Sequence, residues 1–213
     1  RDDSKITYYS INLETGEEQP VTPTGEAGFI AEVEGEYLYA LSRGGQGRGA
    51  YTHVSRFHLA TGEREDIIEL PKGRPFSANL TVDAGGELVL FFSPSGTPRH
   101  IDLFVGRVSD GAIFPVAEDK PWSHFQFSPQ RAGLFNFLDQ PSRNARKWSA
   151  LGLGRINAAT GASQTLQLDP QGEFFRERAG QLVASHPFWD ADGELMIDMV
   201  DTTRPYTDEY VMR

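Results

Sequence analysis

The chain has 213 residues, 38% of them hydrophobic, with 30 acidic and 20 basic side chains and a formal net charge of −10. This hydrophobic content is enough to fill a core, which excludes wholesale disorder. The negative charge and the lack of a basic stripe argue against nucleic acid as a partner, and no apolar run approaches the roughly 18 residues of a membrane span.

Four similar hairpin turns divide the chain at nearly equal intervals. Their glycines are separated by 46, 49 and 50 residues and stand at Gly16, Gly62, Gly111 and Gly161. Glycine supplies the positive φ that a tight hairpin needs. A total of 22 glycines and 13 prolines favours many short strands over long helices. The absence of cysteine excludes disulfides and fits a cytoplasmic or a periplasmic location.

A second hairpin recurs between these turns, and two of its four copies carry a histidine. The copies cover 29–40, 79–90, 123–138 and 185–200. Each unit of about 50 residues therefore predicts four short antiparallel strands, A to D, which is the pattern of a β-propeller blade. An immunoglobulin-like sandwich is the alternative, but it would not repeat at a fixed period.

We expect one all-β propeller domain over residues 1–213. Its blade repeats lie near 1–24, 25–74, 75–120, 121–170 and 180–213. The chain opens on strands C and D of one blade and ends near strand C of another, which gives about four blades. The two ends either complete one shared blade or belong to an arc of a larger ring. We favour the larger ring, because an open arc leaves unpaired sheet edges. The remaining blades of the full-length chain, or a second copy of this chain, would then complete the propeller.

Propeller topology predicts a cluster of basic side chains on one rim. His124 and His186 lie at the start of strand A, beside the central channel. Arg48, Arg143 and Arg146 lie in connections between strands B and C, which share that face. The simpler interpretations are that the histidines are structural and that the arginines are solvated loop charges. The glycine-rich loop with Arg48 resembles a mobile loop tip more than a phosphate site, since no helix follows it.

This cluster of basic residues suits an acidic oligosaccharide. The planar guanidinium of arginine pairs with a carboxylate through two hydrogen bonds, and histidine takes up a proton near neutral pH. Together they suit β-elimination on a uronic acid, in which arginine neutralises the carboxylate and histidine removes the C5 proton. No metal-ligand spacing and no nucleophile motif is present.

The runs His124-Phe125-Gln126-Phe127-Ser128-Pro129, Arg146-Lys147-Trp148 and His186-Pro187-Phe188-Trp189-Asp190-Ala191-Asp192-Gly193 resemble the oligogalacturonate lyases, polysaccharide lyase family twenty-two. The resemblance implies a seven-bladed propeller that cleaves short pectic oligomers. It makes His186 the base and Arg146 the clamp for the substrate carboxylate, with Arg155 or Arg143 as substitutes. His124, Trp189 and Arg48 are then expected to bind substrate.

The same resemblance implies a divalent metal, usually manganese. The family holds it with a Gln-x-x-His-x-His element of later blades, which this sequence lacks. Two other functions stay open. One is a non-catalytic, TolB-like propeller that binds protein or glycan on the histidine rim. The other is the accessory propeller of a prolyl-peptidase-like enzyme.

Overall fold

The computed structural model describes residues 6–28, 31–43, 50–139, 150–168, 182–201 and 209–212. Every regular element in these ranges is a β-strand, and no helix there is long and apolar enough to cross a membrane. The strands are β1 (Tyr9–Ile11), β2 (Glu18–Pro20), β3 (Glu32–Glu34), β4 (Tyr37–Ser42), β5 (His53–His58), β6 (Arg64–Glu69), β7 (Leu80–Val82), β8 (Leu88–Pro94), β9 (Ile101–Arg107), β10 (Ile113–Lys120), β11 (Trp122–Phe127), β12 (Leu134–Asp139), β13 (Ala150–Ile156), β14 (Ser163–Gln167), β15 (Leu182–Trp189), β16 (Leu195–Asp201) and β17 (Glu209–Met212).

The strands form five antiparallel sheets in chain order, which we call blades 1 to 5. Blade 1 holds β1 and β2, and blade 5 holds β15 to β17. Blades 2, 3 and 4 have four strands each, in the orders β3-β4-β5-β6, β7-β8-β9-β10 and β11-β12-β13-β14. Each strand therefore pairs with its sequence neighbour, and the predicted all-β architecture of four-stranded antiparallel sheets is confirmed.

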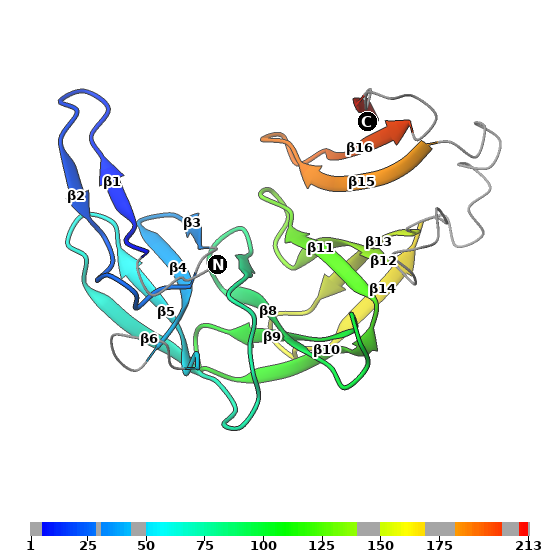
Figure 1. Ribbon diagram of the computed structural model, residues 1–213, viewed down its shortest axis with the longest axis horizontal. Helices are drawn as coiled ribbons and strands as arrows, with labels where there is room; N and C mark the ends of the chain where they lie inside the picture. The colour runs from blue at the N-terminus through cyan, green and yellow to red at the C-terminus, as the bar shows by residue number, and fades with distance from the viewer. Residues whose placement is uncertain are drawn as a thin grey trace.

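The blades follow one another along an arc, with blade 1 at one end and blade 5 at the other (Figure 1). The first strands of neighbouring blades contact each other, as β3 does β7, β7 does β11, and β11 does β15. The first strand of each complete blade is thus the inner strand, and β15 takes the same place in blade 5. This arrangement brings side chains about fifty residues apart in the sequence to one central region.

The hydrophobic core lies between successive blades. One cluster joins blades 3 and 4 and includes Leu90, Leu103 and Phe135, all of them fully buried. Another joins blades 2 and 3 around Leu41 and Phe91. Burial of side chains of this size contributes about 1.5–3 kcal/mol each, so packing between neighbouring blades is the main force that sets the arc.

The four recurring turns have one geometry. Their glycines have φ angles of 69–72°, in the left-handed region that only glycine adopts without cost. In each turn the glycine N–H donates to the carbonyl four residues earlier, as Gly62 does to His58 and Gly161 to Asn157, both at 2.8 Å. These turns lie between β1 and β2 in blade 1 and between the third and fourth strands of blades 2, 3 and 4.

One detail of the sequence prediction needs correction. We expected His186 at the start of strand A, but β15 begins at Leu182 and His186 is its fifth residue. The pairing of β15 with β16 is interrupted between Ala184 and Pro187, so the histidine lies in a β-bulge. The strand continues through Pro187, which pairs with Ile197 at the end of the bulge. Proline has no N–H to donate to a sheet, and within sheets it is typically found at bulges and edges.

Candidate functional site

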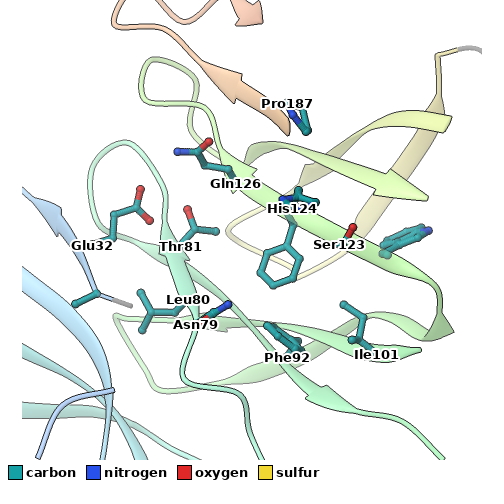
Figure 2. Close-up of a pocket in the computed structure, with 13 residues that line it drawn as sticks. Glu32, Asn79, Leu80, Thr81, Phe92, Ile101, Ser123, His124, Gln126 and Pro187 are labelled. Atoms are coloured by element: carbon teal, nitrogen blue, oxygen red, sulfur yellow. The ribbon is translucent and has the colours of Figure 1, made fainter. Parts of the chain in front are cut away.

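A pocket of about 640 Å³ lies against the inner strands of blades 2 to 5 (Figure 2). β3 contributes Glu32, β7 contributes Thr81, β11 contributes the run from Trp122 to Gln126, and β15 contributes Pro187. Asn79, just before β7, also lines it. Phe92 of β8 and Ile101 of β9 complete one side of it. Because most of its lining comes from the inner strands, the pocket lies on the inner side of the arc, and we call it the axial pocket.

The sheet register defines one equivalent position on each inner strand. The last paired residues before the first turn are Glu34, Val82, Phe127 and Trp189. The residue three positions earlier is Ala31 in blade 2, Asn79 in blade 3, His124 in blade 4 and His186 in blade 5. We call this the ring position. The first three of these residues line the pocket. The side chain of His186 lies outside the description, and its backbone places it at the ring position of blade 5.

His124 has an unusual backbone for a residue in a strand. Its φ angle is 51°, in the left-handed region, and its strand is bulged between Ser123 and Gln126. A left-handed conformation costs a residue with a Cβ about 1–2 kcal/mol. The side chain is exposed and borders the pocket, and the backbone carbonyl accepts a hydrogen bond of 3.0 Å from the Nδ2 of Asn136. The structure therefore bends β11 at the histidine that the sequence singled out.

Glu32 brings an acidic group to the same pocket. Its Oε2 accepts a hydrogen bond of 2.7 Å from the Val82 N–H, which ties blade 2 to blade 3. Burial raises the pKa of this carboxyl, while hydrogen bonds from Thr81 and Val82 act in the opposite direction. The pocket thus combines an imidazole with a carboxyl group whose ionised form is disfavoured by desolvation.

Hydrogen bonds also join blade 3 to blade 4. The Oγ1 of Thr81 accepts from the Phe127 N–H at 3.2 Å, and an Asp83 oxygen accepts from the Gly133 N–H at 3.3 Å. Burial raises the pKa of Asp83 against three backbone hydrogen bonds that lower it. These contacts hold blade 3 against blade 4, and Thr81 is the one of these residues that lines the pocket.

Trp189 lies between blades 4 and 5. Its Nε1 donates to the Gln126 carbonyl at 3.1 Å, and its side chain is half-buried. The neighbouring Asp190 accepts from the N–H groups of Asp192 and Glu194, at 3.0 and 2.8 Å, and so stabilises the turn between β15 and β16. Trp189, which we expected to bind substrate, is therefore seen to hold β15 against β11.

Arg155 lies away from the pocket. It is exposed and lies near the end of β13, where it pairs with Leu134 at the start of β12. Ser123, which lines the pocket, pairs with Leu138 near the other end of β12. It borders a different hollow, together with Gly133 and Gln164. Arg48, Arg143 and Arg146 lie outside the described residues. The structure therefore does not bring Arg155 to His124, and it leaves the other three arginines as predictions.

The other three histidines have local partners. His53 lies 3.9 Å from Asp66, and the His58 ring packs edge-on against Tyr37. His100 contacts the Asp119 carbonyl at 2.9 Å. None of the three borders the axial pocket.

Sequence reasoning missed Glu32, Asn79 and Asn136. Asn79 could have been found by aligning the repeats on the first turn, since it occupies the ring position of blade 3. Asn136 interrupts the apolar run Leu134 to Leu138, which is a signal visible in the sequence. Glu32 gives no such signal, because only the packing of blade 2 on blade 3 brings it to the pocket.

The residues described here do not by themselves fit a manganese ion. Within the described ranges no three His, Cys, Asp or Glu side chains converge, and the pocket offers His124 and Glu32 alone among such groups. We therefore derive no catalytic step through a metal.

Comparisons with known proteins agree on the fold. No protein-family model matches the sequence, and no curated protein matches it. An oligogalacturonate lyase in complex with manganese covers 97% of this chain with a TM-score of 0.65 and 14% identity. The oligogalacturonate lyase of Vibrio parahaemolyticus also covers 97%, with a TM-score of 0.67 and 13% identity. A putative TolB from Agrobacterium tumefaciens covers 98%, with a TM-score of 0.58 and 14% identity.

Identities this low show the fold alone, and that fold is the β-propeller. The propeller prediction is thereby confirmed. The chain spans 59% of the length of each of the two lyases. The activity of those whole enzymes is accordingly carried to this chain only as a proposal.

Proposed function

We propose that this chain belongs to a polysaccharide lyase that cleaves oligogalacturonate or a related uronate oligomer by β-elimination. The observation that carries the proposal is the ring position. It puts His124 on the wall of the axial pocket and assigns His186 to the same place on the next inner strand. The similarity in fold to two oligogalacturonate lyases supports it.

The reaction needs a base and a group that neutralises the uronate carboxylate. The base takes the proton from C5, the C4–O bond breaks, a C4=C5 double bond forms, and the leaving oxygen receives a proton. In our proposal His186 is the base, a step worth about 10²–10⁴ in rate. Arg146, or Arg143 in its place, binds the carboxylate through two hydrogen bonds. Arg155 is less suited, because it borders the other hollow.

The remaining lining suits a sugar. Phe92, Trp122 and Phe125 offer apolar surface, and Asn79 and Gln126 offer amide groups. A ligand site combines such apolar walls with a few polar groups that fix orientation. A volume of about 640 Å³ accommodates a short oligosaccharide.

The test is a lyase assay with trigalacturonate. We expect an increase in absorbance near 235 nm, the mark of an unsaturated uronate, and a loss of about 100-fold or more in kcat for His186→Ala. His58→Ala is the matched control, because His58 packs against Tyr37 in blade 2, outside the pocket lining. It should keep its rate within about two-fold, as expected for a residue remote from the site. Full activity in His186→Ala would remove the proposed base.

One observation favours a second candidate, a propeller that binds glycan without turnover. Within the described ranges no arginine lines the pocket, and the carboxyl group of Glu32 does. Trigalacturonate binding measured by calorimetry, without any change at 235 nm, would select this candidate over the lyase.

A further inference from the structure

Among blades 2 to 5, the second strand has one position where blade 4 differs from the others. The second-to-last residue of each inner strand pairs with a residue of the second strand. This partner is Leu38 in blade 2, Leu90 in blade 3 and Met196 in blade 5. In blade 4 this residue is Asn136, which pairs with Gln126. Asn136 is fully buried, with 0% of its surface exposed. An amide therefore replaces an aliphatic side chain at one point of a repeated core.

This exchange is unfavourable for the core itself. The Oδ1 of Asn136 is buried and has no hydrogen-bond partner, and the same is true of the nearby Ser123 Oγ. A buried polar atom without a partner costs about 1–3 kcal/mol. The leucines at the equivalent positions carry no such cost. Packing alone thus gives no reason for an asparagine here.

The amide nitrogen of Asn136 contacts a residue of the candidate site. Its Nδ2 donates to the carbonyl of His124 at 3.0 Å, and His124 is the residue whose φ angle of 51° bends β11. Asn79, at the ring position of blade 3, precedes a strand that pairs without a bulge. The buried amide and the strained histidine therefore occur together in blade 4. Strain of this kind persists only where the surroundings enforce it.

We propose that Asn136 is a positioning residue, which holds the left-handed bulge at His124 so that the imidazole stands in the axial pocket and contacts the bound oligosaccharide. The acidic sugar as ligand rests on the proposed function. The conformational part stands on the contacts of Asn136 and His124 alone. The core of blade 4 is then less stable than one with leucine at position 136, and the imidazole of His124 is held in place.

The first test substitutes Asn136→Leu, which installs the residue of blades 2 and 3. We expect the melting temperature to stay level or rise, because the unpartnered Oδ1 is removed. The affinity for trigalacturonate should fall by about 10-fold or more, because the imidazole is released from its fixed position. Leu90→Met is the matched control, and it should change neither quantity. A melting temperature that falls while the affinity is kept would overturn the proposal, since the amide would then act only on stability.

The second test uses His124→Gly, which keeps a left-handed backbone without strain and lacks the imidazole. We expect this variant to lose affinity to a similar extent and to regain part of it with free imidazole in the buffer. In the His124→Gly background, Asn136→Leu should have no further effect on affinity, because Asn136 acts through His124. Two independent losses that add would contradict the proposal.

The proposal and the proposed function fail in different ways. Binding of trigalacturonate without absorbance at 235 nm removes the lyase and leaves the two variants to be judged by affinity. If trigalacturonate does not bind at all, the uronate ligand is wrong. The positioning role is then judged by the φ angle of residue 124, measured from backbone scalar couplings. A left-handed residue in the wild type and an extended one in Asn136→Leu would support it, and an unchanged angle would overturn it.

Discussion

The outer turns and the inner strands of this propeller are repeated with very different fidelity. The four recurring turns share one backbone, with glycine φ angles of 69–72° and the same hydrogen bond from the glycine N–H. The ring position, by contrast, holds three different residue types, with Ala31 in blade 2, Asn79 in blade 3, and histidine in blades 4 and 5 (His124 and His186). The turns thus serve the scaffold alone, while the inner strands vary the chemistry that the scaffold presents at its axis.

The largest effect is expected where the scaffold is tightest. Gly154 in β13 lies so close to the ring of Phe135 that an added Cβ would overlap it, and Phe135 is fully buried. Gly154→Ala should therefore destabilise the protein by about 3 kcal/mol, as overpacking of a core does. Gly96→Ala is the control, because a Cβ there meets nothing within 4 Å. Urea unfolding of both variants measures the difference, and equal stabilities would mean that the Phe135 ring does not lie over Gly154 as described.

A smaller effect is expected in the outer turns. A Cβ on Gly16 has open space, so Gly16→Ala measures the cost of the left-handed backbone alone. We expect a loss of about 1 kcal/mol, and a smaller one for Gly16→Asn, since asparagine adopts this conformation more readily. Thermal unfolding distinguishes the two variants. If alanine were tolerated as well as asparagine, the common geometry of the turns would not be what glycine maintains there.

The smallest effect concerns the acid on the inner strand of blade 2. Burial raises the pKa of Glu32 above its ordinary value of 4.5. The protonated carboxyl group of Glu32 therefore contributes its full stabilisation below pH 4.5. This contribution is lost as the pH rises through the raised pKa of Glu32 in the folded protein. Glu32→Gln keeps an acceptor for the Val82 N–H and carries no charge, so it should be more stable than the wild type at pH 7 by a few degrees in Tm. This advantage should disappear near pH 4, and a constant difference across this range would contradict the assignment.

The sequence was sufficient to predict the repeat and its turns, because both depend on local chemistry. Glycine at Gly62 or Gly161 is required by the backbone of a single hairpin, and the alternation of each strand is visible within a few residues. The place of His124 beside the axis followed from the same repeat, since the topology of a blade fixes which strand lies innermost.

The contacts at the site could not be predicted in this way, because they depend on register and on packing between blades. The bulge at His124 shifts its pairing relative to blade 3, and no residue nearby in the sequence announces it. Glu32 reaches the pocket only because blade 2 packs on blade 3, some fifty residues further along the chain. The positions of Arg143 and Arg146 stay predictions for the same reason.

The central claim is that the inner strands bring His124 and His186 to one axial site for an acidic oligosaccharide. The chain has five histidines, and three of them, His53, His58 and His100, serve as internal references. The direct measurement is an NMR titration of imidazole-labelled protein with trigalacturonate. We predict that the signals of His124 and His186 shift together with one binding constant while the other three stay in place. Shifts confined to His53, His58 or His100, or different binding constants for His124 and His186, would contradict the account.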